Sequence, residues 1–145
     1  MSLPFPDDTF DVIINADFIE HTPSEAKLPI FVEMQRVLKK GGRAVVYSPN
    51  LNKIRWVLFG ERAKRLLRLR SDPVPRWQEF VDPDHFGLTT PWKVERELRR
   101  AGFQTSICYS DFHVPVLSKI PGANLLLRPL ISAQFMDRYL VVAEK

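Results

Sequence analysis

The chain has 145 residues, of which 45% are hydrophobic and 26% are charged, which is enough for one globular domain with a hydrophobic core. It contains no run of 18 or more apolar residues, and its first residues lack the basic and then apolar pattern of a signal peptide. The single cysteine, Cys108, excludes an internal disulfide and a cysteine-based zinc site. We therefore expect a cytoplasmic protein.

The net charge of +4 comes from one segment. Residues 53–76 hold eight Lys or Arg and two acidic residues, and apolar residues recur between the basic ones. This pattern predicts a basic helix over 53–70 within a helical insertion at 53–76. Three interpretations stay open: a solvated helix face, contact with an anionic membrane surface, and, least favoured, binding to nucleic-acid phosphates.

The N-terminal third predicts a strand, a helix and a second strand. Residues 10–16 are rich in β-branched side chains, which is typical of a strand buried on both faces of a parallel sheet. The run Thr22-Pro23-Ser24-Glu25 predicts a helix with Thr22 as its N-cap, interrupted and restarted at Pro29. Gly41 or Gly42 would supply the left-handed residue that ends this helix, and residues 43–48 would form the second strand. A right-handed parallel crossover is the expected connection.

The rest of the chain predicts one further helix and two strands. A helix should begin at Thr90-Pro91 and stop at Gly102, followed by a strand over 103–109 and a last strand over 138–143. Residues 112–131 are apolar but broken by prolines, which indicates an insertion that could act as a lid. The whole chain, 1–145, is interpreted as a single partial domain.

Several motifs together resemble one enzyme family. Five motifs carry the resemblance: the run Leu3 to Asp11 (LPFPDDTFD), the pair Glu20-His21, the run Arg36 to Gly42 (RVLKKGG), Ser48-Pro49-Asn50 and the helix end Arg100 to Phe103 (RAGF). Together they are similar to the motifs of class I S-adenosylmethionine-dependent methyltransferases of the type 11 group. The resemblance implies an α/β fold, a Rossmann-like methyltransferase sheet. It also implies that the first three strands and the glycine-rich cofactor loop are lacking, because the only adjacent glycines precede a strand.

The resemblance implies S-adenosylmethionine as cofactor and methyl transfer to an O, N or C atom of a small molecule. The basic segment 53–70 and the apolar segment 112–131 together favour an apolar or membrane-associated acceptor. It places Asn15, Ala16 and Asp17 beside the methionine part of the cofactor, at the carboxyl end of the first strand. The other interpretation of Asn15 and Asp17 is that they bond to loop backbone groups.

Glu20, His21 and His85 are the candidate catalytic residues. His21 or His85 would serve as general base, because an imidazole titrates near neutral pH. Asp17, Glu20, His21 and His85 could also bind a divalent metal, as in the metal-assisted branch that methylates RNA 3′ ends or quinone precursors. In that branch glutamate is usual at the position of Asp17.

A partial sheet would leave one edge of the 11–16 strand unpaired. An apolar unpaired edge is a template for pairing with another chain, so the sequence predicts a homodimer through this edge or a piece of a longer protein. A non-catalytic half-domain that dimerises or binds a partner is therefore the alternative to the enzyme.

Overall fold

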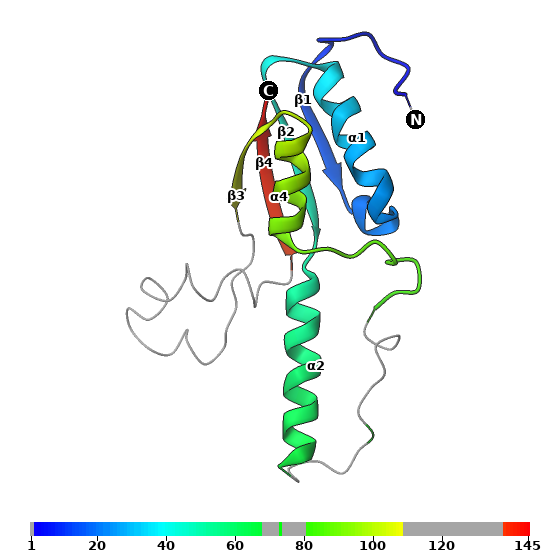
Figure 1. Ribbon diagram of the computed structural model, residues 1–145, viewed down its shortest axis with the longest axis vertical. Helices are drawn as coiled ribbons and strands as arrows, with labels where there is room; N and C mark the ends of the chain where they lie inside the picture. The colour runs from blue at the N-terminus through cyan, green and yellow to red at the C-terminus, as the bar shows by residue number, and fades with distance from the viewer. Residues whose placement is uncertain (1, 68–72, 74–80, 109–137) are drawn as a thin grey trace, which may run out of the picture.

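The computed structural model describes residues 2–67, 73, 81–108 and 138–145. Four of its segments form one mixed sheet in the order β1-β2-β4-β3: β1 (Phe10–Ala16), β2 (Leu38–Pro49), β3 (Gln104–Cys108) and β4 (Arg138–Glu144). β1 runs parallel to β2, and β4 runs antiparallel to both β2 and β3 (Figure 1). The α/β fold class and all four expected strands are confirmed, with β2 beginning earlier than expected.

Two helices, α1 (Ser24–Val37) and α4 (Pro91–Arg100), lie next to each other over one face of this sheet (Figure 1). The residues of the central strands that point to this face are fully buried, and they form one core with the apolar sides of the two helices. The core residues are Ala44, Val46, Tyr139, Val141 and Ala143 from the sheet, and Phe31, Met34, Val94 and Leu98 from the helices. This alternation between a buried and a more open face is what a sheet covered on one side requires.

Two expected details of α1 are wrong. Thr22 does not cap the helix: Pro23 takes the N-cap position without a side-chain bond, and the Thr22 hydroxyl donates to the carbonyl of Phe18 at 3.2 Å. Pro29 does not break the helix either, since α1 continues through it. A proline at this place removes one backbone hydrogen bond, from residue 29 to the carbonyl of Glu25, and the helix continues without it.

Gly41 has a positive φ of 76°, as expected, but it does not end α1. The helix ends at Val37, and the chain turns directly into β2 at Leu38. The pairing of β1 with β2 jumps from Phe10–Leu38 to Val12–Arg43, so Gly41 lies in an irregular stretch between the two. A glycine tolerates this conformation because it has no Cβ.

β1 is not buried on both faces. It lies at the edge of the sheet, and its side chains Val12 and Ile14 are 56% and 71% exposed. The sequence resembles a central strand, whereas among the described residues β1 pairs with β2 alone.

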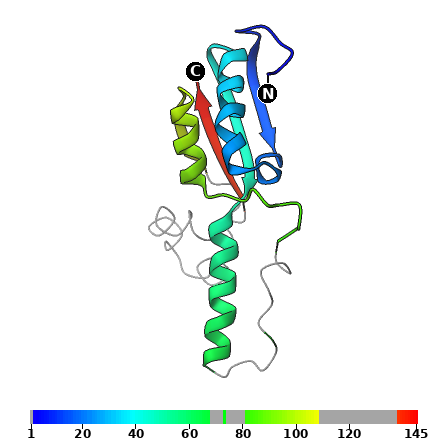
Figure 2. The ribbon, with the colours of Figure 1, turned by 45° about the vertical axis from the view of Figure 1, so that its right-hand side comes forward.

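Part of the expected basic segment forms the helix α2 (Leu51–Leu66), which starts where β2 ends and extends away from the sheet (Figures 1 and 2). Residues 68–72 and 74–76 of the expected insertion lie outside the described residues. Asn50 caps it by accepting a bond from the backbone N–H of Asn52 at 3.1 Å. Among the described residues, no helix is both long and apolar enough to cross a membrane. The expected insertion at 112–131 lies outside the described residues.

Candidate active site

The carboxyl ends of the parallel strands β1 and β2 lie side by side. Directly after β1, the Asp17 N–H donates to the carbonyl of Tyr47 at 3.0 Å. Asp17 adopts a φ of 48°, in the left-handed region that non-glycine residues seldom occupy, although aspartate tolerates it better than most. Conformations of this kind cluster at functional sites, and strand carboxyl ends are where open α/β sheets bind ligands.

The Asp17 carboxylate pairs with Arg138, the first residue of β4. The Arg138 guanidinium lies over the ring of Tyr47, with its central carbon 5.1 Å from the ring centroid. Both charged side chains are partly exposed, so the pair contributes little to stability. Its effect is to hold the Asp17 side chain toward β4.

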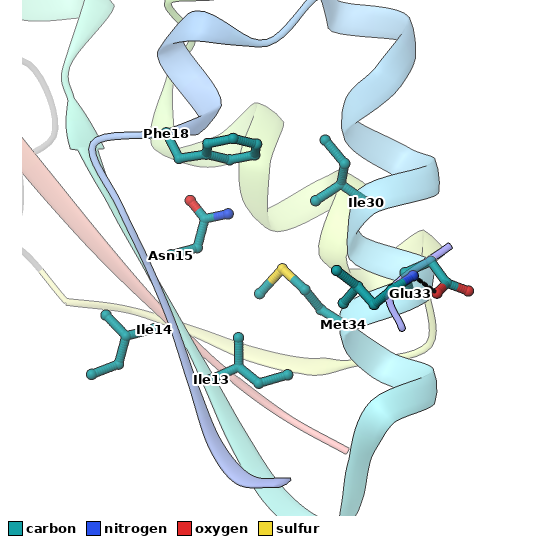
Figure 3. A pocket seen from close by; sticks show the side chains of 8 residues that line it. Ile13, Ile14, Asn15, Phe18, Ile30, Glu33 and Met34 are labelled. Atoms are coloured by element: carbon teal, nitrogen blue, oxygen red, sulfur yellow. Dashed lines mark hydrogen bonds between the residues drawn. The ribbon is translucent and has the colours of Figure 1, made fainter. Parts of the chain in front are cut away.

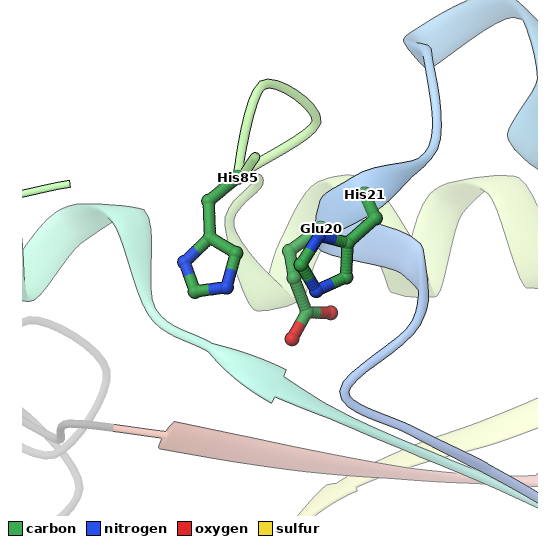
Figure 4. A group of neighbouring side chains, drawn as sticks. All are labelled: Glu20, His21 and His85. Carbon is green, nitrogen blue, oxygen red and sulfur yellow. The ribbon is translucent and has the colours of Figure 1, made fainter. Parts of the chain in front are cut away.

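Glu20, His21 and His85 come together, as Figure 4 shows, although 64 residues separate the two histidines in the sequence. One ligand-type atom from each lies within 4.8 Å of the others. The two imidazole rings meet edge to face, with centroids 4.7 Å apart. Glu20 and His21 belong to the short helix η1 (Ile19–His21), which follows Asp17.

Glu20 is fully buried, and its two carboxylate oxygens differ in their hydrogen bonding. Its Oε2 accepts a hydrogen bond from the Ser48 hydroxyl at 3.0 Å, whereas its Oε1 is buried and has no hydrogen-bond partner among the residues that the structure describes. An unpartnered buried carboxylate oxygen is costly, so its persistence points to a proton, a ligand or a metal ion that would complete it.

The loop that carries His85 is held by two bonds to η1 and one to Lys27 of α1. The Gly87 N–H donates to the carbonyl of Glu20 at 2.6 Å, and the buried Lys27 ammonium donates to the carbonyl of Gly87. The His21 ring bonds through Nδ1 to the carbonyl of Asp84 at 3.0 Å. Because a carbonyl can only accept, Nδ1 carries the proton, and Nε2 of the neutral ring keeps its lone pair.

Lys27 has an altered acidity because of where it lies. Burial lowers its pKa to about 8, and the nearby charge of Lys93 acts in the same direction, while Glu20 acts against it. Close to Glu20, burial also raises the pKa of the Tyr139 hydroxyl. Both groups therefore favour their uncharged forms more than they would in water.

A separate apolar groove of about 190 Å³ runs between β1 and α1 (Figure 3). Its lining comes from the N-terminal segment, β1 and α1: Leu3, Ile13, Ile14, Asn15, Phe18, Ile30, Glu33 and Met34. Arg36 holds the pKa of the Glu33 carboxyl down at about 2, and that carboxylate accepts the N–H of Leu3 at 2.8 Å. The Oδ1 atom of Asn15 is buried with no hydrogen-bond partner.

The structure thus brings together three of the four residues expected to bind metal. Asp17 lies apart from them in the part of the chain described here, because its carboxylate is held by Arg138. Sequence analysis missed Lys27 and Arg138. A lysine among the buried positions of α1 would have been a signal for Lys27, but Arg138 is brought to Asp17 only by the pairing of β4 with β2.

Comparison with known proteins identifies the fold. A family model described as a methyltransferase domain matches residues 1–46, and no curated protein sequence matches the chain. A solved S-adenosylmethionine-dependent methyltransferase from Archaeoglobus fulgidus is similar over 97% of this chain and 62% of its own, with a TM-score of 0.66 and 19% identity. This is the class I methyltransferase fold.

Two further methyltransferase structures match the same fold at 14% identity and a TM-score of 0.59. One is an S-adenosylmethionine-dependent methyltransferase from Mesorhizobium loti, matched over 99% of this chain and 65% of its own. The other is a phosphoethanolamine N-methyltransferase from Haemonchus contortus in complex with S-adenosylmethionine, matched over 97% and 34%. This methyltransferase-fold chain thus spans less than two thirds of the length of each of these proteins, which agrees with the expected partial sheet.

The residues at the carboxyl end of β1 fit part of a cofactor site. The end of β1 offers a strained Asp17 backbone and polar side chains at the place where open α/β sheets bind ligands. The sequence has no glycine-rich turn that opens a helix, which is the element that holds a cofactor's anionic group in such sheets.

Proposed function

We propose that this chain forms part of an S-adenosylmethionine-dependent methyltransferase acting on an O, N or C atom of a small, apolar acceptor. The observation that supports this most is that residues 1–46, which match the methyltransferase family model, contain the strained strand end at Asp17 and the Glu20-His21 pair. Asn15, Ala16 and Asp17 would hold the methionine part of the cofactor, and the cofactor would supply an electrophilic methyl group.

The chain's own residues would position the acceptor and remove its proton. His21 or His85 would take the proton as the acceptor atom bonds to the methyl carbon and the methyl–sulfur bond breaks. The Glu20 carboxylate, close to both rings, would stabilise the imidazolium so formed. Holding acceptor and base in this geometry lowers the barrier mainly through positioning.

Titration with S-adenosylhomocysteine, followed by NMR, tests the cofactor assignment. With one wall of the site present, we expect a dissociation constant on the order of 1 mM, or about −4 kcal/mol. Asp17→Asn keeps the backbone conformation but removes the charge, and it should weaken binding about three- to fivefold, the effect of one exposed charge. Glu25→Gln, an exposed carboxylate outside the site, should change nothing. Saturable binding that is equal in all three proteins would contradict the assignment.

A metal-assisted form of the reaction is the second candidate, and the unpartnered Oε1 of Glu20 supports it. Glu20 Oε1, His21 Nε2 and an imidazole nitrogen of His85 would bind one divalent ion, which would polarise the acceptor's hydroxyl group. Bonds of about 2.0–2.2 Å to a single ion bring ligand atoms to about 3–3.5 Å of one another, so the group would have to close slightly.

Calorimetric titration with Mn²⁺ and with Zn²⁺ tests this second candidate. Glu20→Gln and His85→Asn should each lower the affinity at least about tenfold, because each removes a ligand. Glu25→Gln serves as the control for unspecific carboxylate binding. Heats that are the same for the wild type and both site variants would rule the metal out.

The uncovered edge of β1 supports a third candidate, a half-domain without catalytic activity that dimerises or binds a partner. This candidate predicts that the chain associates through β1.

A further inference from the structure

We propose that α2 binds the surface of anionic lipid bilayers, lying in the interface with its apolar side toward the lipid. This inference does not depend on the methyl-transfer proposal. It rests on the distribution of charged and apolar side chains around one helix and on where that helix lies.

One side of α2 is apolar and exposed. Trp56, Phe59, Ala63, Leu66 and Leu67 recur at the spacing that places side chains on a single helix face. Phe59 is 62% exposed and Leu66 is 84% exposed, and Trp56 meets Phe59 edge to face at 5.6 Å. Exposed apolar patches of this kind mark sites that bind membranes or other proteins.

Another side of α2 is already covered by the protein. Leu58 is buried, and Ile54 and Val57 are half-buried. Among the described residues of α2, the side chains that are buried and those of the exposed apolar face thus lie on different sides of the helix.

Basic residues flank the exposed apolar face. At 100° per residue, Arg55 and Arg62 lie along one side of it, next to Leu66, and Lys64 lies beyond Leu67 on the other side. α2 carries five basic residues and one acidic residue, Glu61, which pairs with Lys64 at 2.8 Å. An apolar face of Trp, Phe and Leu between basic flanks is the arrangement of helices that bind in the plane of a bilayer surface.

The charge favours lipid over the other occupants that an apolar face could have. A second copy of this chain would bring an equally basic helix against the first, and like charges repel. An anionic bilayer attracts each basic residue near its surface and takes up the apolar side chains in the same contact. A shallow hollow of about 250 Å³ on this helix is lined by Asn52, Arg55, Trp56 and Phe59. In it a guanidinium group lies next to aromatic side chains.

The position of α2 makes the contact geometrically open. In both views the helix extends beyond the carboxyl ends of the strands, away from α1 and α4 (Figures 1 and 2). It begins at Leu51, directly after β2, so adsorption would hold the candidate active site close to the bilayer. An apolar acceptor dissolved in the lipid would then be near the site.

Vesicle co-sedimentation of the full chain tests the proposal. The wild type should sediment with vesicles that contain phosphatidylglycerol, and binding should fall with added salt and be much weaker to phosphatidylcholine alone. Phe59→Ser with Leu66→Ser should lower partitioning at least about tenfold through lost apolar burial. Arg55→Gln with Arg62→Gln should lower it by about tenfold or more on the anionic vesicles only.

The matched control is Trp92→Ser, which removes an aromatic side chain that is 44% exposed on α4, against 42% for Trp56 on α2. It should bind vesicles like the wild type, and circular dichroism should show that all variants stay folded. The proposal is overturned if the wild type stays in the supernatant, or if the α2 variants bind as well as the Trp92 control. It is overturned too if Phe59→Ser with Leu66→Ser turns a dimer into a monomer, since the apolar face would then belong to a second copy.

Discussion

Gly87 is the point at which the His85 loop approaches η1 most closely. A Cβ at this position would collide with the carbonyl oxygen of Thr22 and would lie 2.9 Å from the carbonyls of Glu20 and Ile19. All three are backbone atoms, which cannot move aside as the end of a side chain can. We expect Gly87→Ala to destabilise the fold by about 1–3 kcal/mol in urea unfolding, the usual cost of overpacking.

Gly60 provides the control for this substitution. It lies inside α2, and a Cβ there would meet no atom within 4 Å. Gly60→Ala should therefore stabilise the protein by about 0.5–1 kcal/mol, because alanine favours the helix. Equal effects of the two substitutions would show that the loop does not pack on η1 as described.

Lys27 makes stability depend on pH in a predictable direction. Its pKa is about 8 in the folded protein and about 10.5 when unfolded. Between these values the unfolded state binds more protons, so the Lys27 contribution to the free energy of unfolding rises as the pH increases from about 8 to 10.5. Below pH 8 the full cost of burying the charge is present.

Urea unfolding of the wild type and of Lys27→Met at pH 7 and pH 10 measures this dependence. Relative to the variant, the wild type should gain stability at the higher pH. A difference between the two proteins that stays constant with pH would mean that Lys27 is not buried in its charged form.

At the scale of elements, the exposed edge of β1 should govern self-association. Ile14 projects from this edge strand and lines the apolar groove beside α1 (Figure 3). If a second copy pairs there, light scattering should show a mass that rises with concentration, and Ile14→Lys should abolish the rise by adding a charge to the edge. Val32→Lys changes an exposed apolar residue of α1 outside the groove lining and should leave the association unchanged. A monomer at all concentrations would count against homodimerisation.

The elements could be predicted where the local pattern decides them. Thr90-Pro91 capped and opened α4 as expected, with the Thr90 hydroxyl accepting the N–H of Lys93 at 3.3 Å, because capping needs only neighbouring residues. The same kind of argument was wrong at Thr22, whose hydroxyl donates to the carbonyl of Phe18, the residue before η1. Nothing in the sequence indicated the short helix η1, which ends directly before Thr22, so that Pro23 rather than Thr22 takes the N-cap position of α1.

The candidate site could be predicted in its composition but not in its arrangement. Glu20 and His21 are neighbours in sequence, so their proximity followed directly. The approach of His85 depends on Gly87 and Lys27, and the separation of Asp17 depends on Arg138, residues that are brought in by tertiary contacts. Contacts of this kind carry no periodic signal in the sequence.

At the scale of the whole molecule, the described residues form a four-stranded sheet with one face covered by two helices and with β1 and β3 as its edge strands. The methyltransferase fold places the ends of β1 and β2 at the ligand-binding side of such a sheet. The central claim is that these ends form one wall of a cofactor site. It can be tested without the remainder of a longer domain, because weak binding still perturbs the residues in contact.

The measurement that tests this claim most directly is a map of backbone amide chemical shifts during titration with S-adenosylhomocysteine. The account predicts saturable shifts at Asn15, Ala16 and Asp17 and at the neighbouring end of β2, from Tyr47 to Asn50, with α4 unaffected. Shifts confined to other parts of a folded protein, or none at millimolar ligand, would contradict it.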